Sequence, residues 1–294
     1  MGWQEDKQYI TRRYFEAINL NNIELFGRIK KHQDGIRPIY PLVVFIIERL
    51  AAVTDLTVRD NVWDAEIVHR TALETFVKFL FIISGDKSEQ QVRLNEYWNE
   101  LEEINRLRQS EQAKKNLSQF GHIENIRLSY SPMVITPEEE EKLRAKWTRT
   151  KRQQLEQKWS FSEMLNSLVK NYKGQPMDMF VGLAHSYRMA SHVGHGDETG
   201  VLIIAEREQR SQEYKDIANF AHYLRLMSDS FIYCMWTAYE ASIFVNDDPK
   251  FFLELNNSLE DIHDLASKYS LKLYDDPDYD KYRTRPDDGQ KSSC

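Results

Sequence analysis

A helical period dominates this chain, because apolar residues recur about every 3.6 positions over most of its 294 residues. Few turn residues interrupt the pattern: glycine occurs 11 times and proline 8 times, both below average usage. Hydrophobic residues make up 41% of the chain, which is enough to bury a sizeable core. The sequence therefore predicts an all-α fold.

The period and its breaks predict where the elements lie. We expect helices over residues 3–32, 41–57, 61–83, 88–117, 137–158, 161–172, 176–192, 211–244 and 249–269. Residues 120–136 are expected to be irregular, and the β-branched, apolar residues 201–205 are typical of a short strand. The predicted domains are an N-terminal helix (1–37), a single helical bundle (38–270) with a basic peripheral helix (137–158), and a disordered tail (271–294).

Composition excludes several function classes. A net charge of -7 repels polyanions, so contact with nucleic acid requires a local basic patch. Two cysteines do not make a disulfide scaffold, and a cytoplasmic location is expected. The apolar run 41–47 is too short to span a membrane, and no secretory signal is expected at the N-terminus. Phosphate-binding loops, dinucleotide fingerprints and paired CxxC motifs are absent, so no cofactor is expected.

The most informative segment, residues 185–197, holds three of the chain's eight histidines at the end of an expected helix. If the helix reaches residue 195, side chains four or seven positions apart share a surface. That surface presents a phenol, a hydroxyl, a guanidinium and imidazoles from Tyr187, Arg188, Ser191, His192 and His195.

Three interpretations of this surface stay open. Imidazole, with an ordinary pKa of ~6.5, can exchange a proton with a ribose 2′-hydroxyl while arginine holds the phosphate, and this chemistry needs no metal. Alternatively, a metal binds to imidazole and carboxylate ligands, namely His192, His195, Asp197 and also His185. In the third interpretation the histidines only cap the helix C-terminus, where positive charge is favourable.

A second constellation lies on the expected helix 61–83. Arg70 and Glu74 are four apart in a helix otherwise filled with apolar residues, and Glu66, His69 and Lys78 lie nearby. Buried charges of this kind must be paired, so they either brace the bundle or line an internal site.

The basic stretch 142–158 is the one obvious candidate for binding phosphates. Arg149, Lys151 and Arg152 are its candidate RNA contacts, and Trp147 and Trp159 are placed to stack on a base. The competing interpretation is a solvated helix whose charges pair with neighbouring glutamates.

These motifs resemble a prokaryotic family called domain of unknown function 5677. Its members carry an Arg-x-x-x-Glu pair, matched by Arg70 and Glu74, and a Tyr-x-x-x-Ser-x-x-x-His pattern, matched by Tyr187, Ser191 and His195. The resemblance covers roughly residues 40 to 245.

That family is similar to the HEPN superfamily of helical bundles, which includes metal-independent RNases of toxin and antiviral defence systems. The superfamily signature, arginine and histidine separated by four to six residues, is matched by Arg188 and His195, although Met189 stands where active members often have a polar residue. The resemblance implies a HEPN-like ribonuclease with RNA as substrate, a homodimer, and a protein partner from a defence system. It implies His195 as general base or acid, Arg188 as transition-state stabiliser, Tyr187 and Ser191 as phosphate-orienting groups, and Arg70 as a second cation oriented by Glu74. The alternative is a non-catalytic helical module that binds a partner protein or a nucleotide.

Overall fold

The computed structural model describes residues 2–174 and 180–275, and every regular element in that part of the chain is a helix. The predicted all-α fold is confirmed. The contacts between helices divide the chain into two compact units, one made of residues 1–79 and 182–294 and the other of residues 80–181. The predicted domain boundaries at residues 37 and 270 are not tested by this division and stay predictions.

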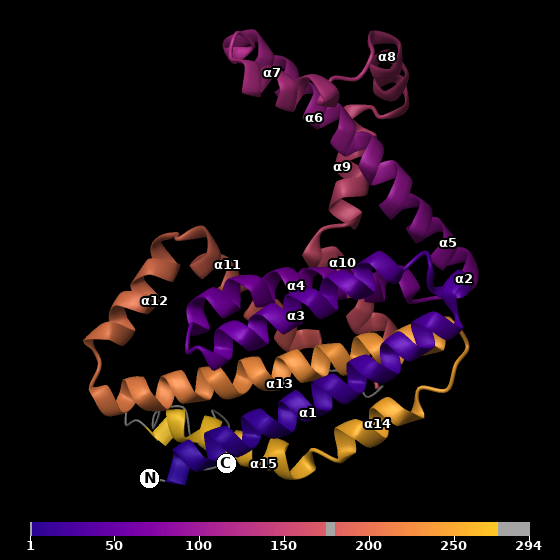
Figure 1. Cartoon of the computed structure of the whole chain (residues 1–294). Helices are drawn as coiled ribbons and strands as arrows, with labels where there is room; N and C mark the ends of the chain where they lie inside the picture. Colours follow the sequence, from indigo (N-terminus) through magenta and orange to yellow (C-terminus); the bar gives the residue numbers. More distant parts are fainter. Residues whose placement is uncertain (1, 175–179, 276–294) are drawn as a thin grey trace, which may run out of the picture. The chain divides into compact units, whose positions relative to one another are not determined.

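The first unit is organised around one long helix. Its elements are α1 (Gly2–Lys31), α2 (Gln33–Ile36), α3 (Tyr40–Val58), α4 (Val62–Ile83), α11 (Phe180–His195), α12 (Glu198–Gln209), α13 (Gln212–Phe244), α14 (Lys250–Asn257), α15 (Glu260–Leu271) and the 3-10 turn η3 (Lys272–Asp275). Helix α13 packs against α1, α3, α14 and α15 (Figure 1). Its buried residues include Leu224, Met227 and Phe231, so the predicted central position of this helix is confirmed.

The second unit is the segment that interrupts the first one in sequence. Its elements are α5 (Lys87–Asn95), the π-helical turn η1 (Glu96–Glu100), α6 (Leu101–Phe120), α7 (Glu124–Tyr130), the 3-10 turn η2 (Ser131–Met133), α8 (Pro137–Lys146), α9 (Arg149–Lys158) and α10 (Phe161–Asn171). Helix α6 contacts α7, α8 and α9.

Helix α4 ends in a polar cap. Buried Arg93 donates hydrogen bonds to the Phe81 and Ser84 carbonyl oxygens, both at 2.6 Å, so it satisfies groups that a helix end leaves without partners. Gly85 follows with φ of +85°, and Asp86 caps α5 by accepting hydrogen bonds from the next turn.

Three predictions of local structure are wrong. Residues 201–205 lie in α12 and form no strand, because Asp197 caps that helix. The segment 120–136, expected to be irregular, contains α7. The basic helix expected over 137–158 is broken between Lys146 and Arg149, where Thr148 caps α9 by accepting a hydrogen bond from the Lys151 amide.

The single helix predicted near the C-terminus is wrong, and two further predictions fall partly outside the described residues. Helix 249–269 is divided into α14 and α15. The predicted start of helix 176–192 and most of the predicted disordered tail lie outside the described residues, although the first residues of that tail form η3. Along the part of the chain that the structure describes, no helix is long and apolar enough to cross a membrane.

Candidate functional site

Helix α11 extends to His195, as the predicted shared surface requires, and Gly196 follows with φ of +58°. Arg188 and His195 are exposed, whereas Tyr187, Ser191 and His192 are half-buried. Among the described residues, neither Arg188 nor His195 has a side-chain hydrogen bond or ion pair with another residue. Both side chains are therefore accessible to a ligand.

The structure joins the two predicted constellations through Tyr187. The Arg70 guanidinium donates a hydrogen bond to the Tyr187 hydroxyl at 3.1 Å, and that hydroxyl donates to Glu74 at 3.4 Å. Arg70 also lies over the Tyr187 ring, 4.8 Å from its centroid. Lys78 completes the cluster with an ion pair to Glu74 at 2.7 Å. These contacts hold α11 against α4.

The carboxylate of Glu74 is kept charged by its partners. Burial by itself would raise its pKa, but the hydrogen bond and charge of Lys78, the charge of Arg70 and the Tyr187 hydroxyl together lower that pKa below the ordinary value. A charged Glu74 balances the two cations beside it. Arg70 and Glu74 are thus connected through the hydroxyl of Tyr187 from a second helix, and the ion-pair partner of Glu74 is Lys78.

His192 and Asp197 pair with each other where α11 meets α12. The His192 Nδ1 atom lies 2.7 Å from one carboxylate oxygen, and the Gly200 amide donates to the other oxygen at 3.1 Å. These two hydrogen bonds lower the pKa of the Asp197 carboxyl. Within residues 2–174 and 180–275, no three His, Cys, Asp or Glu side chains are grouped to hold a metal ion. Asp197 acts as a helix cap here, and the metal interpretation of His192, His195 and Asp197 gains no support.

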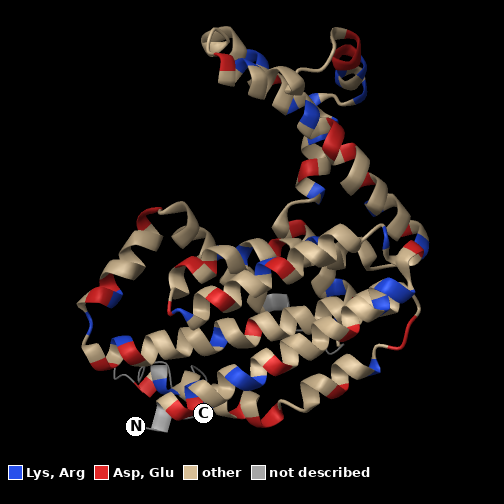
Figure 2. Ribbon diagram, viewed as in Figure 1, with Lys and Arg blue, Asp and Glu red and all other residues tan. Residues whose placement is uncertain are grey.

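The predicted RNA contacts Arg149, Lys151 and Arg152 lie in the first turn of α9, in the second unit. None of them forms an ion pair with another described residue. Arg144, Lys146 and Lys158 of this stretch pair with glutamates, and acidic and basic residues are interspersed along α6, α8 and α9 (Figure 2). Examples are Arg144 with Glu111 at 2.6 Å and Lys146 with Glu103 at 2.6 Å.

The two tryptophans of the basic stretch are not available for stacking on a base. Trp147 and Trp159 are 8% and 7% exposed. Their indole nitrogens donate to Glu103 and Glu96, at 2.6 and 3.0 Å. Buried indoles with satisfied N–H groups pack the second unit, so the predicted stacking role is wrong.

A buried charged cluster lies between α4 and α13, and the sequence analysis noted only its α4 members. Glu66, 6% exposed, pairs with both His222 and Arg225. Arg225 also pairs with Asp229 at 3.0 Å, and fully buried His69 has its Nε2 atom 3.7 Å from Asp229. Charges buried at this depth are tolerated because each carboxylate has a cationic or hydrogen-bonding partner.

His222 uses both ring nitrogens inside this cluster. Its Nε2 atom contacts Glu66, and its Nδ1 atom lies 3.4 Å from the Arg207 guanidinium, which can only donate. Nδ1 must therefore accept, so the ring is neutral. Burial, followed by the charge of Arg207, lowers the pKa of His222 to about 4, in agreement with this geometry.

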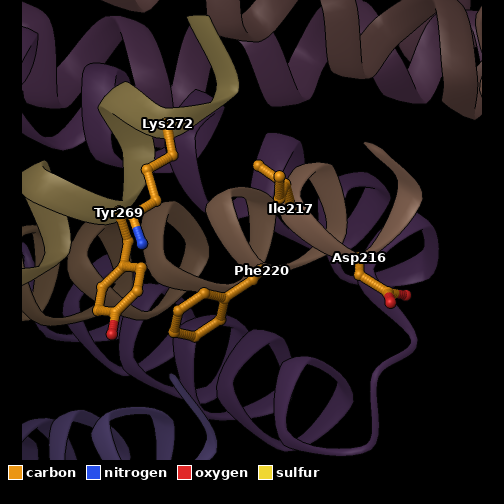
Figure 3. Close-up of a pocket in the computed structure, with 5 residues that line it drawn as sticks. All are labelled: Asp216, Ile217, Phe220, Tyr269 and Lys272. Carbon is orange, nitrogen blue, oxygen red and sulfur yellow. The ribbon is translucent and has the colours of Figure 1, made fainter. Parts of the chain in front are cut away.

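Described residues of the first unit line at least two cavities. The larger, of about 280 Å³, is lined by Trp63, Glu66, His185, Ser186, Met189, Ala190, Val193, Ile203, Arg207, His222 and Arg225. The smaller, of about 90 Å³, lies beside α13 and is lined by Asp216, Ile217, Phe220, Tyr269 and Lys272 (Figure 3). The larger cavity shares α11 with the predicted site but uses other residues of that helix.

Comparison with known proteins gives a family match. The model of a family described as a family of unknown function, DUF5677, matches residues 37–210, which is more than half of the chain. Neither a curated protein nor a solved structure matches. The matched segment contains Arg70, Glu74 and α11, and it ends before α13.

Proposed function

The chain belongs to the DUF5677 family, and from the accessible surface of α11 we propose that it is a metal-independent, HEPN-like ribonuclease and the effector of a bacterial toxin or antiviral defence module. The observation that supports this proposal most is that Arg188 and His195 are both exposed on one helix, two turns apart. Two helical turns separate their backbones by about 10 Å, which an arginine and a histidine side chain reaching toward each other can bridge around one phosphate.

In this mechanism the imidazole of His195 takes the proton from a ribose 2′-hydroxyl. The 2′-oxygen then attacks the phosphorus, the bond to the 5′-oxygen breaks, and the leaving oxygen receives the proton held by the imidazolium of His195, directly or through water. Arg188 stabilises the negative charge that develops on the phosphate, and Ser191 orients it. The products are a 2′,3′-cyclic phosphate and a 5′-hydroxyl.

The contacts of Tyr187 with Arg70 and Glu74 hold the surface of α11 in position. Because the Tyr187 hydroxyl is held between Arg70 and Glu74, the rotation of α11 is fixed relative to α4. Arg70 adds a second positive charge close to α11. His192 and the cations Arg149, Lys151 and Arg152 are proposed to contact the RNA backbone.

A homodimer and a protein partner from a defence system belong to the same proposal. In this mechanism His195 is the one acid–base group, and a second copy of His195 would be supplied when two chains meet at α11. Co-purification with a neighbouring gene product would identify the partner.

The test is cleavage of single-stranded RNA in EDTA. We expect the wild type to cleave RNA to 2′,3′-cyclic phosphate ends and to leave DNA of the same sequence intact, because DNA lacks the 2′-hydroxyl. His195→Ala and Arg188→Ala should each lower the rate by a factor of about 10² or more.

The matched control is His122→Ala, which removes an exposed histidine from the second unit and should leave the rate unchanged. No cleavage at any enzyme concentration, or equal cleavage by His195→Ala, would overturn the ribonuclease proposal.

The second candidate, a non-catalytic module that binds a nucleotide or a partner protein, is favoured by the 280 Å³ cavity beside α11.

A further inference from the structure

The larger cavity is enclosed by four helices of the first unit. Trp63 and Glu66 come from α4, His185 to Val193 from α11, Ile203 and Arg207 from α12, and His222 and Arg225 from α13. Its volume of about 280 Å³ is at the lower end of the range for small-molecule sites, roughly 300 to 1,000 Å³. A small ligand fits it by size.

His222 in the cavity wall is not placed to act as a base for a serine nucleophile. Ser186 lines the cavity, but a serine nucleophile needs a base within hydrogen-bond distance. His222 has both nitrogens engaged, one with Glu66 and one with Arg207. Because the His222 ring has no free acceptor, this residue is suited to binding rather than to proton transfer.

Arg207 is the cation of this wall without a carboxylate partner. Arg225 pairs with Glu66 and Asp229. Arg207, in contrast, forms no ion pair with any described residue: its guanidinium lies 4.5 Å over the Trp63 ring and 3.4 Å from the neutral His222. Burial lowers the pKa of Arg207, which reflects the cost of holding this charge away from water. An anion in the cavity would compensate that cost.

Four other residues that line the cavity are apolar. They are Met189, Ala190 and Val193 from α11 and Ile203 from α12. Ala190 is buried, and the other three are half-buried. A ligand that replaces water against these side chains gains hydrophobic free energy. The cavity therefore combines a cation without a carboxylate partner with apolar lining residues.

We propose that this cavity binds a small organic anion, with the charged group against Arg207 and the compact apolar body against Met189, Val193 and Ile203. His185, at the edge of the cavity, is placed to contact the charged group as well. The binding site is independent of the ribonuclease proposal, since Arg188 and His195 do not line it.

A pair of dyes tests the two halves of the proposal separately. 8-Anilinonaphthalene-1-sulfonate combines an aromatic body with one negative charge, and N-phenyl-1-naphthylamine has the same rings without the charge. Both become fluorescent when water is excluded. We expect saturable binding of both to the full-length protein, with the charged dye binding more tightly.

Substitution of Arg207 should affect the binding of the two dyes differently. Arg207→Gln is expected to lower the affinity for the charged dye by about tenfold or more, because a desolvated charged contact is lost. The affinity for the neutral dye should change less than about twofold. The matched control is Lys272→Gln, which removes the cation of the smaller cavity (Figure 3) and should change neither affinity. Ala190→Leu, which narrows the cavity, should weaken both dyes. Circular dichroism spectra of the variants must match that of the wild type.

Competition then identifies the source of the anion. Displacement of the dye by AMP but not by adenosine indicates a phosphate monoester, and displacement by benzoate but not by benzyl alcohol indicates a carboxylate. The proposal is overturned if Arg207→Gln binds the charged dye as tightly as the wild type, if Lys272→Gln causes the loss instead, or if neutral competitors displace the dye as well as charged ones. Failure of all four competitors, or absence of saturable dye binding, overturns it too.

Discussion

At Tyr187, one phenolic oxygen connects residues that are more than a hundred positions apart. Removal of this oxygen by Tyr187→Phe deletes the acceptor for Arg70 and a donor to Glu74 while keeping the ring that Arg70 covers. Since both partners are half-buried, we expect a loss of about 1 to 2 kcal/mol in the free energy of unfolding. Urea unfolding followed by circular dichroism measures it.

The control for this substitution is Tyr239→Phe. Tyr239 is also half-buried, and its ring packs on Trp236, but its hydroxyl has no hydrogen-bond partner among the described residues. Its removal should cost less than about 0.5 kcal/mol. Equal losses in the two variants would show that the hydroxyl of Tyr187 does not hold α11 to α4.

Sequence spacing predicted the residues that lie on one helix far better than those that meet between helices. The pair Arg70 and Glu74 and the α11 face follow from helical geometry. The Glu66–His222 contact joins residues 156 positions apart, and no local period carries that information. A signal was nevertheless present, because His222, Arg225 and Asp229 interrupt the apolar pattern of the longest helix at helical spacing.

Between elements, the junction of α11 and α12 depends on the absence of a side chain at Gly200. A Cβ atom there would lie 2.4 Å from the His192 carbonyl oxygen and 2.8 Å from the Val193 amide nitrogen. Because the clash is with backbone, α12 would have to move away from α11. We expect Gly200→Ala to lower the free energy of unfolding by about 1 to 3 kcal/mol, as overpacking does.

Gly27→Ala is the matched substitution, since Gly27 is also helical and a Cβ atom there meets nothing within 4 Å. It should stabilise the protein by about 0.5 to 1 kcal/mol, because alanine is the better helix former. Thermal unfolding of both variants measures the difference. Equal changes of the same sign would show that helix propensity, and not the close approach of α12, governs position 200.

The junction of α11 and α12 also explains why the strand predicted over residues 201–205 is wrong. Their β-branched and apolar side chains are typical of a strand, but Asp197 accepts the Gly200 amide hydrogen bond and starts a helix three residues earlier. Val201 and Leu202 are more than half exposed, so burial of an apolar strand face does not compete with the cap. A strong N-cap outweighed the β propensity of a short segment.

For the whole molecule, the period of the sequence predicted the fold class and most helix positions, but not which helices form a unit. The chain leaves the first unit at residue 79 and returns to it at residue 182. The apolar stripe of an amphipathic helix does not identify the helix that will cover it. Which helices pack together in a unit is therefore decided by long-range packing. The pairing of basic side chains with glutamates on α6 is a result of that packing.

The buried histidines predict how the stability of the molecule depends on pH. His222, His69 and His263 all have lowered pKa values, chiefly because burial disfavours the charged ring. Between pH 6.5 and about 4 the unfolded chain binds a proton at His222 that the folded chain does not. The contribution of these histidines to the free energy of unfolding is therefore fully present above pH 6.5 and is lost on acidification. The loss due to His222 is ~3 kcal/mol.

His222→Gln keeps a hydrogen-bonding side chain beside Glu66 and Arg207 but cannot be protonated. We expect its free energy of unfolding to fall less steeply between pH 7 and pH 4.5 than that of the wild type, with the remaining slope due to the other buried histidines. Exposed His122 provides the comparison, and His122→Gln should keep the wild-type slope. Urea unfolding at a series of pH values measures all three proteins. The inference that His222 is neutral is wrong if the wild type gains stability on acidification, because a charged ring beside Glu66 would favour the folded state at low pH. It is also wrong if the free energy of unfolding of His222→Gln falls as steeply with pH as that of the wild type.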